Sequence, residues 1–292
     1  MTGLLRLLLI LAGTLPLMLT HALGALLGNV LWCLPIGLKR RTLRHLELCL
    51  PELDAAGRRR IARRSLVHSA KAVLEVPAIW FGPRWRLRRW LTDAATQAQM
   101  QALIDGGRGV ILLCPHLGAW ELAGLFCAAV GPMTTLYKPQ KGAMNALILE
   151  GRRRNGAQLV PTSTGGVKAL LQALRRRGMV GILPDHDPPE GSGAFAPFFG
   201  RPAHTTTLVS KLASRSAVPV WFFYAERLPW GRGFRFHLRP APEGIDDAGE
   251  RGLAALNLGV EQVIRHLPEQ YWWSYKRYRR LPAGAPDPYH GL

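Results

Sequence analysis

The stretch Gly109-Val-Ile-Leu-Leu-Cys-Pro-His116-Leu-Gly-Ala-Trp-Glu121 decides the fold of this chain. The apolar run Val110–Cys114 predicts a strand that is buried on both of its faces. Gly118 then breaks the chain, and residues 119–130 have the composition of an apolar helix. A buried strand that leads directly into a helix is typical of an α/β domain with a parallel sheet.

The same alternation continues towards the C-terminus. Further strands are predicted at residues 134–137, 158–160, 180–183 and 218–224, with an alternating edge strand at 234–238. Helices are predicted between or after them at residues 143–154, 167–177, 205–214 and 253–266. We therefore expect an α/β domain over residues 106–292, with a mostly parallel central sheet flanked by helices.

The N-terminal segment predicts a membrane anchor over residues 1–40. No formal charge occurs from Leu7 to Leu38, and about 20 apolar residues suffice for a helix to cross a bilayer. The run continues too far for a cleaved signal peptide, so we expect one transmembrane helix. Basic residues directly follow it and place the C-terminal side in the cytoplasm. The alternative is a shallow interfacial hairpin broken at Pro16 and Pro35.

Residues 41–105 are expected to form a helical segment on the membrane surface, because apolar and basic residues are mixed within the helix predicted at 54–81. The 292-residue chain has 38 Lys and Arg against 19 Asp and Glu, a formal net charge of +19. Such a surface attracts lipid headgroups, an acidic protein or nucleic acid. Tryptophans between arginines would also suit nucleic acid, but the apolar anchor favours the membrane.

No metal or cofactor is predicted. The four cysteines lack a C-x-x-C spacing, and three of them lie in apolar runs, as buried reduced thiols do. Pro184-Asp185-His186-Asp187 follows a strand and contains possible metal ligands, but no cysteine or H-E-x-x-H helix accompanies it. Asp185 would instead orient an arginine or bind the hydroxyls of an acceptor sugar. A solvated turn is the alternative.

His116 and Glu121 form the candidate catalytic pair. His116 follows the carboxyl end of a strand, which is where open α/β sheets bind ligands. Glu121 lies in the first turn of the next helix, so its carboxylate can accept a hydrogen bond from one imidazole nitrogen. The other nitrogen can then remove the proton from a lipid hydroxyl that attacks a thioester, with the helix amides stabilising the oxyanion. The alternative is a helix-capping histidine and a glutamate paired with an arginine.

Three arginines, Arg152–Arg154, close one predicted helix. Cations at this position interact well with the helix dipole, so a structural role is the simplest interpretation. Recognition of phosphate or of an acidic carrier is the functional alternative, and we expect Arg152 or Arg154 to reach the site. The apolar segment Phe198-Phe-Gly-Arg-Pro202 would line an acyl path or pack in the core.

Several of these motifs occur together in a known family. They are Leu46-Glu-Leu-Cys-Leu-Pro-Glu-Leu53, Pro115-His-Leu-Gly-Ala-Trp-Glu121, Tyr137-Lys-Pro, Gly151-Arg152, Pro184-Asp-His-Asp187, Phe198-Phe-Gly-Arg-Pro202 and Pro268-Glu-Gln-Tyr-Trp-Trp273. With the N-terminal anchor, they resemble the late acyltransferases of lipid A biosynthesis, the lauroyl and myristoyl transferases within the lysophospholipid acyltransferase group. The resemblance covers nearly the whole chain.

The resemblance implies a glycerol-phosphate-acyltransferase-like fold and an enzyme of the bacterial inner membrane. It implies acyl carrier protein, or coenzyme A, as the acyl donor and a hydroxyl of a lipid A precursor as the acceptor. It also implies His116 as base and Glu121 as its partner. Substrate-binding roles are implied for Arg152, Arg154, Asp185, Tyr137, Lys138 and Arg201. The alternatives are another lipid acceptor, a membrane-bound ester or thioester hydrolase, or a basic binding module without catalysis.

Overall fold

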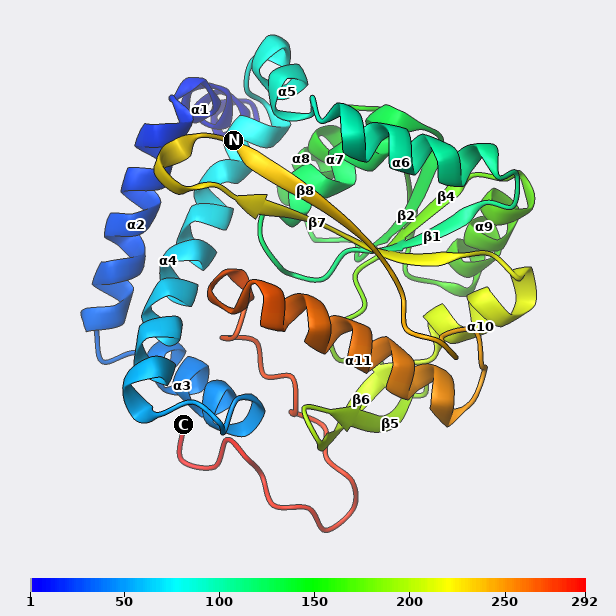
Figure 1. Ribbon diagram of the computed structural model, residues 1–292. Helices are drawn as coiled ribbons and strands as arrows, with labels where there is room; N and C mark the ends of the chain where they lie inside the picture. The colour runs from blue at the N-terminus through cyan, green and yellow to red at the C-terminus, as the bar shows by residue number, and fades with distance from the viewer. Residues whose placement is uncertain (1) are drawn as a thin grey trace.

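A six-stranded sheet forms the centre of the protein, seen here in a computed structural model that describes residues 2–292 (Figure 1). The strand order is β3-β2-β4-β1-β7-β8. The first five strands in this order are parallel and β8 is an antiparallel edge strand, as the sequence predicts. The strands are β1 (Val110–Leu113), β2 (Met133–Tyr137), β3 (Gln158–Pro161), β4 (Met179–Ile182), β7 (Val220–Arg227) and β8 (Phe234–Pro240).

Helices cover both faces of the sheet and create two hydrophobic cores. One face packs against α9 (Thr164–Arg175), α10 (Leu208–Ser216) and α11 (Glu250–His266). The other packs against α6 (Ala94–Asp105), α7 (Trp120–Val130) and α8 (Ala143–Arg152). Ile111 and Leu113 belong to the first core, whereas Val110 and Leu112 belong to the second, because successive side chains of a strand point to opposite faces. The expected α/β fold is thus confirmed.

The long helix α4 (Ala55–Trp80) crosses the edge of the sheet at which the parallel strands end (Figure 1). Asp54 caps its N-terminus by accepting a hydrogen bond from the amide of Gly57. Ile61 near its start belongs to the first core and Ile79 near its end to the second. Together with α3 (Gly37–Cys49), α5 (Arg84–Trp90) and α6, this helix ties residues 41–105 to the α/β domain.

The apolar N-terminal run does not form the one long helix that the sequence predicts. It forms α1 (Thr2–Thr14) and α2 (Leu17–Cys33), bent by 108° at the break before Pro16. Proline disfavours the helical conformation in the residue before it. Leu15 precedes Pro16, so α1 ends before Leu15 and α2 begins after Pro16. Within the described residues, no single helix has the length and apolar composition to cross a membrane; only α1 and α2 taken together have them.

The segment after β4 holds a hairpin that the sequence analysis took for a loop. It consists of β5 (Gly193–Phe198) and β6 (Arg201–Thr206), and α10 accordingly begins at Leu208 rather than at residue 205. Pro197 lies opposite Pro202 in this ribbon. Prolines lack the amide that a strand interior needs, but a two-stranded ribbon tolerates them.

The C-terminal segment after α11 is packed rather than helical. It begins with a short 3₁₀ turn, η2 (Pro268–Gln270), and continues in extended conformation. Tyr271 and Trp273 are buried, and the Trp273 indole donates a hydrogen bond to the carbonyl of Pro268. Tyr271 and Trp273 therefore contribute to the packing of the C-terminal segment against the protein.

Candidate active site

The loop after β1 is held by backbone hydrogen bonds at the carboxyl edge of the sheet. The amide of Gly118 donates to the carbonyl of Gln270, and the amide of Ala119 donates to the carbonyl of Ala225. Trp272 in turn donates its amide to the carbonyl of His116. Gly118 has a φ of +60°, and a Cβ atom there would lie 2.0 Å from the Ala225 oxygen, so only glycine fits.

His116 is paired with Asp185 across the sheet. The ring Nδ1 of His116 lies 2.9 Å from Asp185 Oδ1, and the backbone amide of His116 donates to Asp185 Oδ2 at 3.0 Å. A carboxylate only accepts, so Nδ1 carries the proton and Nε2 is the free nitrogen. Asp185 reaches His116 because β4 and β1 are parallel neighbours whose carboxyl ends meet.

The charge on Asp185 is stabilised where it lies. Burial alone would raise the pKa of this carboxyl, but the charge and hydrogen bonds of His116 hold it well below its usual value. Asp185 is 2% exposed, whereas the His116 side chain is 13% exposed. The pair therefore combines a permanently ionised buried acid with an imidazole that solvent or substrate can reach.

His186 stacks face to face on His116. The ring centroids lie 3.7 Å apart with an interplanar angle of 3°, and Tyr275 stacks on the other side of His186 at 3.8 Å. Burial, together with the nearby His116, lowers the pKa of His186 to about 4, so its ring is neutral near pH 7. Ligand atoms of His116, Asp185 and His186 lie within 4.8 Å of one another, which makes this the group that could hold a metal ion among the described residues.

Glu121 does not take the place next to His116 that the sequence analysis gave it. Its carboxylate accepts hydrogen bonds from Arg152 Nη2 at 2.5 Å and Nε at 3.0 Å, and from the Trp80 indole at 3.1 Å. No hydrogen bond joins it to His116 in the part of the chain described. Glu121 lies in the first turn of α7, whereas His116 is turned towards β4, so Asp185 is the nearer acid.

The other expected substrate-binding residues are spread over the structure. Arg152 reaches the site through Glu121, whereas Arg154 donates to the backbone carbonyls of Ile79 and Gly82 and so connects α8 to α4. Tyr137 ends β2 at the same edge of the sheet, followed by the exposed Lys138. Arg201 is exposed at the start of β6, on the hairpin.

An apolar pocket of about 540 Å³, including its open mouth, extends from Glu121 and Arg152 between α7, α8 and the sheet. Its wall is formed mainly by Trp120, Leu125, Met133, Leu159 and Ile182. Gly124 also lines it, and a Cβ atom at that position would meet no other atom within 4 Å. The pocket has the shape and lining that a hydrocarbon chain requires.

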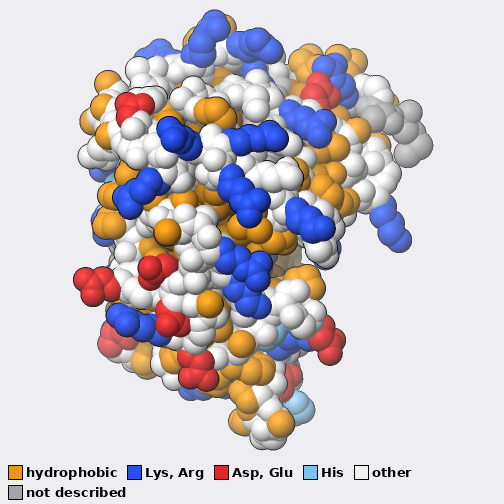
Figure 2. Space-filling model, turned by 90° about the vertical axis from the view of Figure 1, so that its right-hand side faces the viewer, with side chains coloured by type: hydrophobic (Ala, Val, Ile, Leu, Met, Phe, Trp, Pro, Cys, Tyr) orange, Lys and Arg blue, Asp and Glu red, His pale blue; other side chains and the backbone are white. Residues whose placement is uncertain are grey.

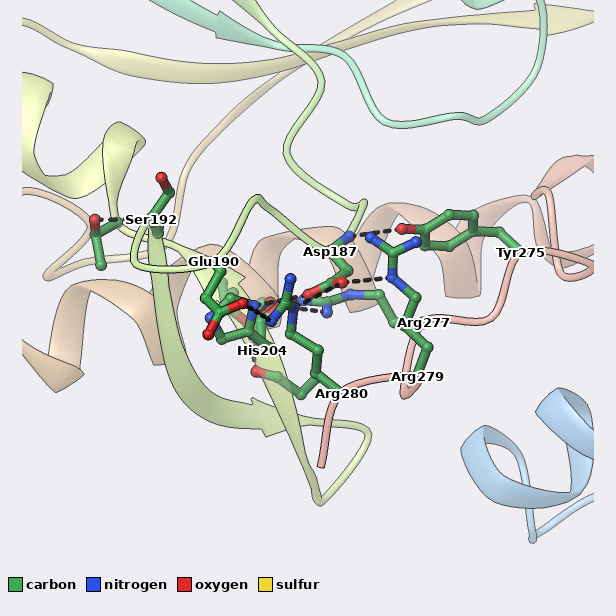
Figure 3. Close-up of polar contacts among 12 residues, drawn as sticks. Asp187, Glu190, Ser192, His204, Tyr275, Arg277, Arg279 and Arg280 are labelled. Atoms are coloured by element: carbon green, nitrogen blue, oxygen red, sulfur yellow. Dashed lines mark hydrogen bonds and ion pairs between the residues drawn. The ribbon is translucent and has the colours of Figure 1, made fainter. Parts of the chain in front are cut away.

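A second Asp–His pair has its aspartate two residues further along the chain (Figure 3). Asp187 Oδ1 lies 2.7 Å from His204 Nδ1, and Asp187 Oδ2 accepts from Arg279 at 2.5 Å and Arg280 at 3.3 Å. The amide of Asp187 donates to the hydroxyl of Tyr275. These contacts tie the segment after β4 to the hairpin and to the C-terminal segment.

The three buried cysteines offer no nucleophile, and the exposed Cys33 does not line the pocket beside Glu121. Cys49, Cys114 and Cys127 are buried, and burial raises the pKa of each thiol well above its usual value. They therefore stay protonated, as their apolar surroundings in the sequence predict. His116 contacts the pocket through Trp120, with their ring centroids 5.5 Å apart.

Comparison with known proteins gives the family. A family described as bacterial lipid A biosynthesis acyltransferase matches residues 2–280 of the chain. The chain belongs to this family. It is therefore an acyltransferase, and the resemblance seen in the sequence motifs is confirmed.

Members of this family differ in the acyl group that their names give. The chain is similar to the lipid A biosynthesis lauroyltransferase of Escherichia coli strain K12, with 30% identity over 84% of this chain and 80% of the relative. It is similar to the palmitoleoyltransferase of the same strain, with 28% identity over 86% and 83%. A lipid A biosynthesis acyltransferase of Haemophilus influenzae is 25% identical over 90% and 83%.

The sequence analysis missed three features of the site. It did not pair His116 with Asp185, did not connect His186 to either, and gave Trp80 no part in holding Glu121. One signal was available, since His116 and Asp185 each follow the end of a predicted strand. Because β1 and β4 are adjacent in the sheet, the two residues that follow these strands come into contact.

Proposed function

We propose that this acyltransferase moves a fatty acyl group from a thioester of acyl carrier protein to a hydroxyl of a lipid A precursor. The observation that carries the proposal is the hydrogen-bonded His116–Asp185 pair, which lies close to an apolar pocket in a chain of this family. The names of the relatives support a lipid A acceptor. The net positive charge supports an acidic carrier as donor.

His116 acts as the general base in this mechanism. Asp185 holds the Nδ1 proton, so Nε2 takes the proton of the acceptor hydroxyl while its oxygen attacks the thioester carbonyl. The tetrahedral intermediate then expels the thiolate, which receives the proton from the imidazolium. An ester and a free thiol are formed, and the imidazole returns to its neutral state.

Glu121 and Arg152 act together at the mouth of the pocket. Glu121 uses both of its oxygens to fix Arg152, and Arg152 Nη1 keeps no partner among the described residues. That group is free to donate to the carbonyl oxygen on which negative charge develops. The backbone amides of Gly118 and Ala119 already donate to carbonyls, so they are not available to the oxyanion. Among the amides at the start of the helix, only those further into α7 remain for that role.

The remaining basic residues contribute to binding. Lys138 is exposed beside Tyr137 at the edge of the sheet where the strands end, and suits the acidic carrier protein. Arg154 supports the site by holding α8 to α4, and Arg201 offers a cation on the hairpin for a phosphate. These roles agree with the family motifs in which the residues lie.

The enzyme works at the cytoplasmic face of the inner membrane. Leucines along the outer sides of α1 and α2 are exposed, among them Leu4, Leu8, Leu11, Leu23 and Leu26. Such a surface is stable only against hydrocarbon or another protein. Because α1 and α2 are separate helices, the bent pair rather than one straight helix provides the membrane contact.

The test is an assay of purified protein with acyl carrier protein thioester, with and without the lipid acceptor. We expect acylated acceptor and free thiol in equal amounts, measured by mass spectrometry. His116→Ala is expected to lower kcat/KM by about 10²–10⁴-fold, as loss of a general base does. His290→Ala is the control, since His290 is exposed near the C-terminus.

Two results would contradict the proposal. Release of free fatty acid at the same rate with and without acceptor would indicate a hydrolase. Full transferase activity of a folded His116→Ala variant would remove His116 as the base. Replacement of the carrier protein by coenzyme A in the same assay identifies the donor.

A further inference from the structure

A groove with four arginines lies between α2 and α4, away from the catalytic pair. It is lined by Asn29 and Trp32 of α2 and by Arg59, Arg60, Arg63, Arg64 and Val67 of α4. Its empty space is about 1000 Å³, including the open side. None of these residues lines the pocket beside Glu121, so the groove is a separate feature of the molecule.

The charges in this groove are poorly compensated by the protein itself. Arg64 pairs with Glu269 at 2.6 Å, and Arg63 Nε donates to the neutral side chain of Asn29 at 2.8 Å. Arg59 and Arg60 make no side-chain hydrogen bond or ion pair with any described residue. Four guanidinium groups thus share one carboxylate, and their mutual repulsion is relieved by an anion that enters between them.

One rim of the groove is apolar and exposed. Leu23, Leu26 and Val30 of α2 are 43%, 63% and 46% exposed, and Trp32 continues this side into the groove. Neither nucleic acid nor a soluble phosphate would use such a rim. An amphiphile would use both sides, with its anion among the arginines and its hydrocarbon against the leucines.

We propose that the groove between α2 and α4 binds the phosphate of an anionic membrane lipid whose chains lie along the exposed side of α2. The site fixes how the enzyme lies on the membrane, because one helix joins the groove to the acyl pocket. The groove lies along the outer side of α4, and Trp80 at the end of α4 donates a hydrogen bond to Glu121. A lipid bound there orients the mouth of the acyl pocket relative to the bilayer.

The test measures binding to vesicles without any acyl donor, so it is independent of the proposed reaction. The full-length protein is mixed with vesicles of phosphatidylethanolamine and phosphatidylglycerol, and with vesicles of phosphatidylcholine alone. The triple variant Arg59→Gln, Arg60→Gln, Arg63→Gln is expected to lose about 100-fold in partitioning onto the anionic vesicles, at ~1 kcal/mol for each cation. Thermal unfolding confirms that the variant is folded.

A matched control removes the same charge elsewhere. The face over α9 and α10 is also rich in Lys and Arg (Figure 2), and Arg175, Arg176 and Arg177 at the end of α9 are exposed. The triple change of these three to Gln is expected to leave anionic-vesicle binding within about threefold, since this face lies at the opposite edge of the sheet. Equal loss in both triple variants would overturn the proposal in favour of general charge attraction.

The apolar rim has its own pair of variants. Leu26→Gln changes a 63% exposed leucine of the rim, and Leu258→Gln changes a 47% exposed leucine on α11. The first is expected to weaken vesicle binding about tenfold or more and the second to leave it unchanged. Unaltered binding of the arginine variant, or displacement of vesicles by millimolar inorganic phosphate, would overturn the lipid assignment.

A second, independent observation concerns the ring stack behind His116. His186 lies parallel to His116, Tyr275 lies parallel to His186, and the Tyr275 hydroxyl is fixed by the amide of Asp187. The Nε2 atom of His186 is buried without a partner in the part of the chain described. A polar ring left unsatisfied in this way indicates that its flat face, rather than its hydrogen-bonding capacity, is what the site uses.

We infer that His186 is a positioning residue that holds the plane of the His116 ring and stabilises its protonated form through the stacked face. This inference rests on the proposed function, in which His116 becomes an imidazolium during each cycle. The face of an aromatic ring stabilises a cation that lies over it. The groups that face the stack are Asp185, Trp120, Trp272, Arg277 and Arg279.

The test compares His186→Phe with His186→Ala. Phenylalanine keeps the flat ring, so kcat is expected to stay within about threefold, whereas alanine is expected to lower kcat about tenfold with little change in KM. In the alanine variant the acidic limb of the pH–rate profile is expected to move to lower pH by up to about one unit, because the imidazolium is less stable. A purely structural role would leave this limb in place.

The outcomes separate this inference from the proposed function. Equal losses in the two His186 variants, or an acidic limb that does not move, would overturn the role of the stack. Full activity of His116→Ala would instead overturn the proposed base. Tyr275→Phe keeps the outer ring and is expected to retain the pH–rate profile of the natural protein.

Discussion

Two Asp–His pairs, whose aspartates are two residues apart in the sequence, have different surroundings in this structure. Asp185 binds His116 through its ring and its amide, and the His116 ring packs against Trp120, which lines the apolar pocket. Asp187 binds His204 but shares its carboxylate with Arg279 and Arg280 (Figure 3). The difference teaches that an Asp–His pair can act as a base only where the acid is not neutralised by arginine and the imidazole can meet a substrate.

The largest expected effect is that of Asp185→Asn. An amide cannot fix the same imidazole tautomer, so kcat/KM is expected to fall by about 10³-fold or more, while the protein remains folded. Asp187→Asn is expected to change kcat/KM by less than about fivefold. The comparison between the two pairs would fail if both variants lost activity to the same degree.

The second effect concerns stability rather than activity. Asp187→Ala removes the buried hydrogen bond to His204, which costs roughly 2 kcal/mol, whereas the pairs with the half-exposed Arg279 and Arg280 add little because solvent screens them. Urea unfolding is expected to report this loss in the free energy of unfolding, with near-normal activity of the folded protein. Asp246→Ala, at an exposed position, is the control and is expected to have no effect.

A third prediction uses pH. The pKa of His186 is lowered to about 4 in the folded protein by burial and by His116, and it lies near 6.5 in the unfolded chain. Between these values the unfolded state binds more protons, so the free energy of unfolding falls as pH falls from about 6.5 to 4. His186→Phe is expected to reduce this slope by up to about 1.4 kcal/mol per pH unit. His290→Gln should leave the slope unchanged, and an identical slope in His186→Phe would contradict the burial of a neutral ring.

The smallest expected effect concerns the apolar pocket, which lies near the His116–Asp185 pair and not near the His204–Asp187 pair. Gly124 faces its empty space, so Gly124→Leu shortens the room for a hydrocarbon chain. The preference among acyl donors is expected to shift about tenfold towards shorter chains, in line with the energy of a few methylene contacts. Gly124→Ala is expected to give a smaller shift and a slight gain in stability, because alanine favours a helix more than glycine does. No change in donor preference would place the acyl chain elsewhere.

The sequence predicts the sheet better than the site, for a physical reason. The strands are short apolar runs whose burial is a local property, so β1, β4 and the edge strand β8 were predicted within one or two residues. The partner of His116 is 69 residues away and depends on which strands are neighbours, which no local pattern reveals. Spacing therefore favoured Glu121, five residues away, over Asp185.

The N-terminal helices and the hairpin show the same limit. Hydropathy treats residues 7–38 as one run, but the conformation at Leu15 and Pro16 divides it into α1 and α2. In the hairpin, Pro197 and Pro202 face each other in a two-stranded ribbon that needs no backbone donor from either. Composition did not reveal the break in the first case, and no local pattern revealed the strands in the second.

The bonds that fix the loop after β1 come from main-chain atoms of Gly118, Ala119 and His116, which meet carbonyls or amides of β7 and the C-terminal segment. Mutation replaces side chains and leaves these atoms in place. Apart from Gly118, where only glycine fits, the backbone frame around the imidazole is thus insensitive to substitution, while the residues of the pocket wall are free to vary. Enzymes with such a frame can exchange one fatty acid for another over evolution without rebuilding the centre that handles the proton.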